Sequence, residues 1–226
     1  MKLKRSHHQS GNRVWPIHAF PVSGSIVSMT LGILLATAGI ARAQTDDFDD
    51  GNDDGWTRFD PLGGLGLPEA TFSFPNGGYR LQAPPPPIPD AGPARAFSYL
   101  TENSYTEFYA AVDVVDWDDS VDQAFGILGR AGNVGLGETT GYVCNYNPNQ
   151  TGSRPGGQFQ INRVTGEAED GTLATANITL IPGRSYRMVF IGTGTVMTGH
   201  LYDHLDLTAP VATLTVDGTE DDRVLT

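Results

Sequence analysis

The sequence contains a single cysteine, Cys144, and no lysine beyond residue 4. One cysteine excludes an intrachain disulfide, so the stability of the chain must come from a hydrophobic core. No base stands near Cys144 in a recognisable pattern, and we expect a small buried side chain there rather than a nucleophile. The sequence also lacks a Gly-rich phosphate loop and a serine nucleophile elbow, so no motif specifies a reaction, and no catalytic residue is assigned.

Positive charge is scarce and lies mostly at the N-terminus. Residues 1–43 hold five of the 14 Lys and Arg and none of the 26 Asp and Glu, so residues 44–226 carry 9 minus 26, a net charge of −17. A chain this acidic repels phosphate backbones and anionic lipid headgroups. Nucleic acid and membrane surfaces are therefore poor partners, whereas cations, neutral sugars and other proteins remain.

Residues 1–43 have the three parts of a secretory signal peptide. A basic region precedes an apolar run at residues 26–40, and Ala41-Arg42-Ala43 supplies small residues at the cleavage positions. The alternative is a membrane anchor, but the run is shorter than the ~20 residues needed to cross a bilayer. We expect cleavage after Ala43, no membrane insertion afterwards, and one domain at residues 44–226 that is secreted, periplasmic or on the cell surface.

Helical periodicity is nearly absent from residues 44–226, whereas short runs rich in Val, Ile, Phe, Tyr and Thr recur between Gly, Pro, Asn and Asp clusters. This pattern is typical of an antiparallel sandwich or barrel. The sequences PNGGY and GTGT predict tight hairpins. The expected strands are 57–59, 70–74, 79–83, 94–100, 106–115, 124–130, 141–146, 157–164, 177–181, 185–193, 196–202 and 211–216.

Strict alternation over residues 106–119 predicts two different faces. Phe108, Ala110, Val112 and Val114 form a core face, and Tyr109, Asp113 and Trp117 lie opposite. Aromatic rings and carboxylates suit sugar recognition, and ordinary cross-strand aromatic contacts are the alternative. Gln158, Gln160 and Asn162 share one face of a later strand, and this row of amides suits sugar recognition or plain solvation. Arg130 is placed to reach a carboxylate such as Asp113 or Glu107. The candidate ligand-binding residues are Tyr109, Asp113, Trp117, Arg130, Tyr142, Gln158 and Gln160.

The acidic stretch DDFDDGNDDGW, residues 46–56, offers a candidate metal site. Asp50, Asn52 and Asp54 match the first half of a calcium loop, and hard oxygen ligands favour Ca²⁺. The second half fails, because Pro61 occupies the position of the bidentate glutamate. The alternative is that these acids cap turns while Phe48 and Trp56 face inward.

Four segments together resemble the concanavalin A-like lectin/glucanase superfamily, and most closely laminin G-like jelly-roll domains of exported bacterial proteins. They are DDFDDGNDDGWTRFDPL, PNGGYRLQAP, YTEFYAAVDVVDWDDSVDQAFGILGRAGNVGLGETTGY and SYRMVFIGTGTVMTGHLYD. The resemblance implies an all-β, two-sheet antiparallel jelly-roll sandwich with one concave sheet, calcium at its rim, and a glycan or surface protein as ligand. Such domains pair the last strand with the first, but little sequence follows residue 216. Either residues 223–226 supply a stub or the first strand has an exposed edge.

The same resemblance shapes the functional expectation. Glucanases of the superfamily carry two Glu flanking an Asp on one strand, whereas DVVDWDD contains no Glu. We therefore expect a noncatalytic module that binds carbohydrate on its concave sheet, with Ca²⁺ as the candidate cofactor. Two alternatives stay open: a glycoside-active enzyme that uses Glu107 with Asp113 or Asp116, and a purely structural cell-surface or matrix domain.

Overall fold

The computed structural model of this chain describes residues 44–84, 95–101, 105, 107–120, 123–148 and 156–218. The expected leader at residues 1–43, most of the proline-rich segment and the expected closing stub at residues 223–226 lie outside the described residues. Within them the chain is all-β, as the sequence predicts, and the one helical element is a 3₁₀ turn at Gly63–Leu65.

Twelve strands occur in the described part of the chain. Four short ones come first: β1 (Trp56–Phe59), β2 (Thr71–Ser73), β3 (Arg80–Gln82) and β4 (Phe97–Leu100). Eight longer ones follow: β5 (Phe108–Val114), β6 (Phe125–Gly132), β7 (Thr140–Asn147), β8 (Gln158–Thr165), β9 (Ala168–Asn177), β10 (Tyr186–Thr193), β11 (Val196–Asp203) and β12 (Ala212–Asp217).

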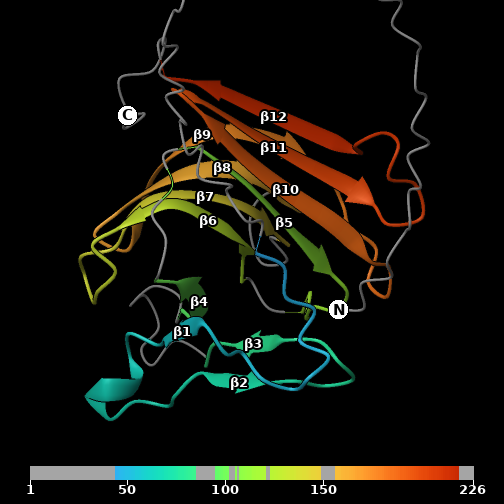
Figure 1. Ribbon diagram of the computed structural model, residues 1–226. Helices are drawn as coiled ribbons and strands as arrows, with labels where there is room; N and C mark the ends of the chain where they lie inside the picture. The colour runs from blue at the N-terminus through green and yellow to red at the C-terminus, as the bar shows by residue number, and fades with distance from the viewer. Residues whose placement is uncertain are drawn as a thin grey trace, which may run out of the picture.

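The eight longer strands form two antiparallel sheets with the orders β12-β11-β10-β5 and β6-β7-β8-β9 (Figure 1). This arrangement is a β-sandwich. Both predicted hairpins are confirmed: β2 pairs with β3 around Asn76 and Gly77, which have φ of 56° and 71°, and β10 pairs with β11 around Gly194, with φ of 54°. Positive φ is the conformation that tight hairpin turns require.

One strand was placed wrongly by the sequence pattern. Residues 177–181 were expected to form a strand, but the strand there is β9, which ends at Asn177. Its hairpin with β8 turns at Gly166 and Glu167, whose φ values are 58° and 64°. A glutamate with positive φ is uncommon. The turn therefore carries only part of the ordinary signal, Gly166, because a glutamate stands where Gly or Asn is usual, and β9 itself is polar and Gly-containing.

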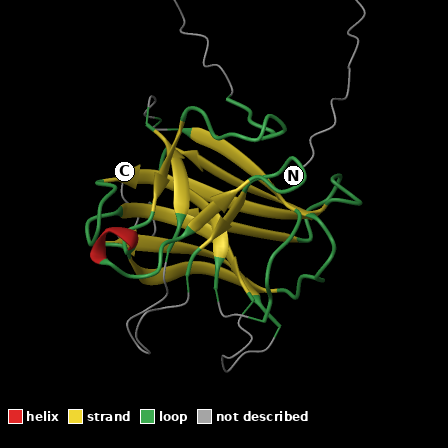
Figure 2. Cartoon of the chain, turned by 90° about the horizontal axis from the view of Figure 1, so that it is seen from below, coloured by secondary structure: helices red, strands yellow, loops and turns green. Residues whose placement is uncertain are grey.

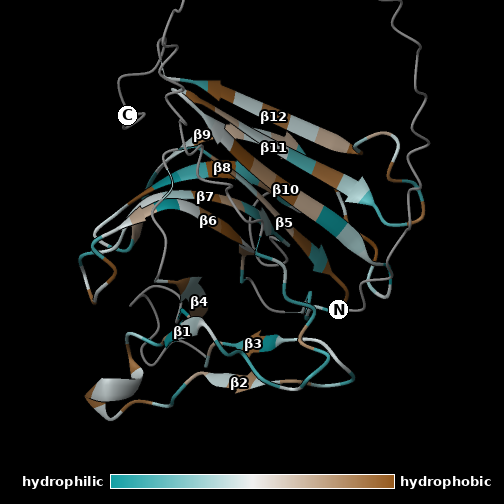
Figure 3. Cartoon of the chain, in the orientation of Figure 1, coloured by the Kyte–Doolittle hydropathy of each residue, from teal (hydrophilic) through white to brown (hydrophobic). Residues whose placement is uncertain are grey.

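The core lies between the two sheets and is built by alternation. Met188 and Phe190 of β10 face Cys144 of β7 and Phe159 and Ile161 of β8, and all five have no exposed surface. Burial raises the pKa of Cys144 to about 12, so its thiol stays protonated at neutral pH, as expected of a structural cysteine. Hydropathy follows the same division: hydrophobic colour fills the middle of β10, and hydrophilic positions recur along β8 (Figure 3).

The short strands form a separate unit with its own aromatic cluster. β1 pairs with β4 and β2 with β3, and in the view from below these pairs lie in front of the sandwich (Figure 2). Phe48 is buried there against Trp56, Phe74 and Tyr79, with ring centroids 4.8–6.3 Å apart. Within the described residues β12 pairs only with β11, so the last strand does not pair with the first.

Candidate functional site

The seven candidate ligand-binding residues do not form one site. Tyr109 and Asp113 lie on the outer face of the sheet that contains β5. Gln158 and Gln160 lie on the outer face of the other sheet, and the remaining three belong to the core or to a bulge. The sandwich therefore separates these two outer-face pairs by its full thickness, because the two outer faces point in opposite directions.

Two of the candidate aromatic residues pack into the core. Tyr142 is 1% exposed and belongs to the core cluster. Trp117 packs against Phe125 and Tyr186, with ring centroids 5.8 and 5.9 Å apart. The alternation predicted for Trp117 is wrong because β5 ends at Val114, so the tryptophan lies beyond the strand. Neither side chain shares a face with Tyr109.

Asp113 is held by Arg187, which sequence reasoning missed. The two residues are register partners on β5 and β10, and Nε and Nη2 of Arg187 each donate to a carboxylate oxygen at 2.7 Å. Nε2 of His204 lies 3.5 Å from Oδ2. Arg130 was placed near Asp113 by the sequence, but it sits at the β6 bulge and donates to the carbonyl oxygen of Gly194. Pairing register, which sequence does not show, decides this partnership.

The environment of Asp113 keeps its carboxyl ionised. Asp113 is 5% exposed, and burial by itself raises its pKa. The hydrogen bonds and charge of Arg187 and the nearby His204 outweigh that effect, so the pKa of Asp113 lies below its ordinary value. Such a carboxylate is a poor proton donor at neutral pH. The exposed neighbour on this face is Tyr109, which is 69% exposed.

The outer face of the β6–β9 sheet carries a row of amides that crosses three strands. Asn145 of β7 stands opposite Gln160 of β8, and Gln158 of β8 stands opposite Asn177 of β9. Nε2 of Gln160 donates to Oε1 of Gln158 at 3.3 Å. Nε2 of Gln158 then donates to Oδ1 of Asn177 at 3.1 Å. The sequence predicts Gln158 and Gln160 on one face, and they do share this one.

A second chain of side-chain contacts runs beside the first and consists of three residues that were not among the candidates. Nδ2 of Asn162 donates to Oδ1 of Asn145 at 3.3 Å, and Nδ2 of Asn145 donates to Oε1 of Glu169 at 3.1 Å. We call Asn162, Asn145 and Glu169 the amide relay. Asn162 has no exposed surface, and its Oδ1 has no hydrogen-bond partner among the described residues. A buried acceptor left without a donor costs about 1–3 kcal/mol.

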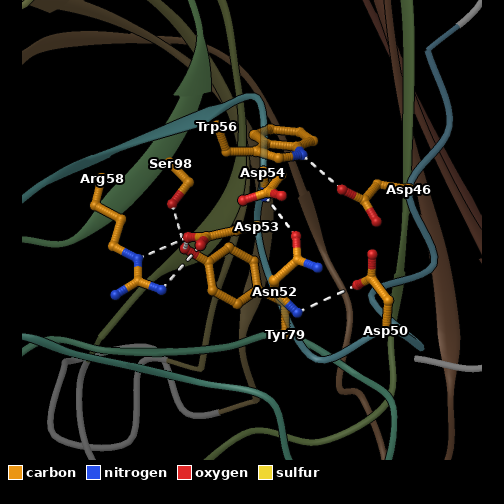
Figure 4. Close-up of polar contacts among 9 residues, drawn as sticks. All are labelled: Asp46, Asp50, Asn52, Asp53, Asp54, Trp56, Arg58, Tyr79 and Ser98. Atoms are coloured by element: carbon orange, nitrogen blue, oxygen red, sulfur yellow. Dashed lines mark hydrogen bonds and ion pairs between the residues drawn. The ribbon is translucent and has the colours of Figure 1, made fainter.

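The acidic stretch is organised mainly by contacts within its own unit (Figure 4). Oδ2 of Asp46 accepts a hydrogen bond from the indole nitrogen of Trp56 at 2.9 Å. Asp53 accepts two bonds from Arg58, at 2.6 and 2.9 Å, and one from the hydroxyl of Tyr79 at 2.6 Å. The hydrogen bond from Arg58 is the main reason that the pKa of Asp53 lies below its ordinary value.

The predicted metal ligands take part in successive turns. Oδ1 of Asp50 accepts from the backbone nitrogen of Asn52 at 3.2 Å, and Oδ1 of Asn52 accepts from that of Asp54 at 2.8 Å. These contacts are Asx turns, the bonding expected of turn-capping residues. Across the described ranges, no group of three or more His, Cys, Asp or Glu is arranged to hold a metal ion.

In the part of the chain that the structure describes, no helix has the length and apolar composition needed to cross a membrane. Comparison of the chain with family models, with curated proteins and with solved structures found no match.

Proposed function

We propose that this chain is a noncatalytic module that binds neutral carbohydrate on the outer face of the β6–β9 sheet. The observation that carries the proposal is the unpartnered Oδ1 of Asn162 within two adjoining rows of amide side chains. Amides both donate and accept hydrogen bonds, so a row of them matches the alternating donors and acceptors of sugar hydroxyls. Because these strands also form one wall of the core, the amides are held on a rigid support.

The charge of the chain favours neutral sugars over acidic ones. Residues 44–226 carry a net charge of −17, and Glu169 stands at the end of the amide relay. Both repel uronic acids and sulfated glycans. A concanavalin A-like jelly-roll topology and an exported location form part of this proposal, and the two stacked four-stranded sheets are consistent with that topology.

Two of the three carboxylates considered for catalysis are committed to other contacts, which favours binding without turnover. Asp113 is held in two bonds by Arg187, and Asp116 pairs with Arg80. A glycosidase needs one carboxyl that holds a proton near neutral pH and a second that is free to act on the sugar. The unpaired buried acceptor at Oδ1 of Asn162 supports a binding module over a structural domain without a small ligand.

Affinity gel electrophoresis tests the proposal, since an acidic protein migrates well in native gels. Gels containing β-1,3-glucan, β-1,4-glucan, xylan or galactomannan are compared with gels that contain no polysaccharide. We expect retardation by at least one of the four polysaccharides. Gln160→Ala should be retarded less, because the side chain of Gln160 is half-buried in the row of amides on the outer face of the β6–β9 sheet. Tyr109→Ala, which alters the opposite outer face, is the matched control.

The outcomes separate the alternatives. An absence of retardation on all four polysaccharides, together with no signal on a glycan array, refutes carbohydrate binding. Retardation that Tyr109→Ala abolishes and Gln160→Ala leaves intact moves the site to the other sheet. Release of reducing sugar that disappears in Glu107→Gln favours the glycoside-active enzyme instead.

A further inference from the structure

The amide relay has a direction, and Glu169 sets it. An ionised carboxylate can only accept hydrogen bonds. Asn145 must therefore turn its Nδ2 towards Oε1 of Glu169, which leaves its Oδ1 to accept from Nδ2 of Asn162. The same step leaves Oδ1 of Asn162 as the head of the relay, an acceptor that requires a donor. Reversing either amide would place two acceptors or two donors against each other.

We propose that Oδ1 of Asn162 accepts a hydrogen bond from a free sugar hydroxyl, and that Glu169 acts as the positioning residue that makes this subsite an acceptor. This inference rests on the proposed carbohydrate binding. It narrows the ligand class to neutral glycans with an unsubstituted hydroxyl at the contact. Groups that only accept, such as ether oxygens and carboxylates, are excluded from the subsite because they would face the lone pairs of the amide oxygen.

A second acceptor lies on the same face. Gln160 donates through Nε2 to Gln158, and no hydrogen bond in the described structure involves its Oε1. Gln160 and Asn162 are two residues apart on β8, so their side chains emerge on one face about 6.6 Å apart along the strand. Gln160 is only half-buried, whereas Asn162 is fully buried. A glycan chain that rests on Gln160 lies on the same face as Asn162, and its hydroxyl reaches Oδ1 once the side chains that cover Asn162 move aside.

An ordered water could supply the donor just as a sugar hydroxyl could, since buried waters commonly satisfy such acceptors. The two sources differ in their consequences. A permanent water makes the acceptor part of the folded protein, so the relay has no influence on which glycan binds. A sugar hydroxyl makes binding sensitive to loss of the donor on the glycan and to loss of polarity in the relay.

The test measures discrimination by the protein expressed from its whole chain. The probes are β-1,3-glucan, β-1,4-glucan, xylan and galactomannan, each compared with its O-methylated form, which keeps the oxygens and loses the donors. The variant is Glu169→Gln, whose side chain can donate as well as accept and therefore allows the relay to reverse. Asp170→Asn is the matched control, because it removes the same charge at the next position and its carboxylate pairs with Arg163.

For the polysaccharide that retards the wild type, we expect methylation to weaken binding about tenfold, the effect of one lost hydrogen bond. Glu169→Gln should bind the unmodified polysaccharide about fivefold to tenfold more weakly than the wild type does. Its affinities for the methylated and the unmodified polysaccharide should differ by less than about twofold. Asp170→Asn should match the wild type in both. Glu169 is exposed on β9, so its substitution leaves the core intact.

Equal binding of methylated and unmodified polysaccharide by the wild type overturns the inference and leaves the proposed function standing. Identical behaviour of Glu169→Gln and Asp170→Asn also overturns the inference, because the effect then comes from charge alone. The donor to Oδ1 of Asn162 is in that case a structural water only. Absence of retardation by any unmodified polysaccharide refutes the proposed function itself and removes the ground on which the subsite was inferred.

Discussion

Replacing Arg187 by methionine tests the ion pair with Asp113, the most buried one in the described part of the chain. The change keeps the aliphatic length of the side chain and removes both donors to the carboxylate. The side chain of Asp113 is 4% exposed and that of Arg187 29% exposed, so solvent reaches the arginine but hardly reaches the acid. Removing one partner of a fully buried pair costs about 3–5 kcal/mol, because the other charge is left uncompensated.

The expected loss is smaller than that range. The guanidinium is partly solvated, and His204 remains 3.5 Å from the carboxylate. We therefore expect Arg187→Met to lower the free energy of unfolding by about 2–3 kcal/mol. For a domain of this size the melting temperature should fall by about 4–12 °C. Asp113→Asn serves as the companion single variant, and the double variant Asp113→Asn/Arg187→Met should regain at least about 1 kcal/mol over the sum of the singles.

Urea unfolding followed by tryptophan fluorescence measures these values, since Trp117 packs against the core. The pH dependence supplies an independent check. The pKa of Asp113 is lower in the folded chain than in the unfolded one, so its contribution is complete above the unfolded value of about 3.9 and is lost as the pH falls through the folded value. The free energy of unfolding should therefore fall less steeply with decreasing pH in Arg187→Met than in the wild type. A loss below about 0.5 kcal/mol, or strictly additive variants, would refute the reasoning.

Three other outcomes are expected. Gly199→Ala should lower stability by about 1–3 kcal/mol in thermal melts, because its Cβ would stand 2.7 Å from Sγ of Cys144, whereas Gly64→Ala, with open space around it, should not. Asp53→Asn should cost about 1 kcal/mol at neutral pH, and this cost should shrink as the pH falls through the lowered pKa of the folded Asp53; a cost that does not change with pH would contradict this. If calcium binds the acidic stretch, millimolar Ca²⁺ added after EDTA should raise the melting temperature, and Asp54→Asn should abolish the rise. A Ca²⁺ concentration of ~100 times the dissociation constant stabilises the fold by about 2.7 kcal/mol. If the melting temperature does not change, calcium is no longer part of the proposal.

Much of the fold follows from local sequence. Alternating apolar residues in β5, β8 and β10 mark one face of each strand for the core, because successive side chains of a strand point to opposite sides. Asn76 with Gly77, and Gly194, mark two hairpins because they tolerate positive φ. These features depend on residues within a few positions of one another, so they can be recognised before the tertiary structure is known.

The end of β5 and the position of β9 show where local pattern fails. Trp117 continues the alternation in sequence, yet its ring turns into the core because the strand stops at Val114. The turn between β8 and β9 places positive φ on Glu167, a residue type that gives no turn signal. Tertiary contacts decide both cases. Burial of a large ring outweighs local preference at Trp117, and at Glu167 the backbone nitrogen of Gly137 donates to Oε2 at 2.6 Å.

The sequence by itself determined that this chain is all-β without an intrachain disulfide, that residues 44–226 carry a net charge of −17, and that Gln158 and Gln160 share a face. Only the tertiary structure decided that Arg187, 74 residues away, holds Asp113, and that Asn162, Asn145 and Glu169 join into one relay. It also divided the candidate ligand residues between opposite sides of a sandwich. The physical reason is that faces are local properties of a strand, whereas partners depend on register between strands, which the core as a whole fixes.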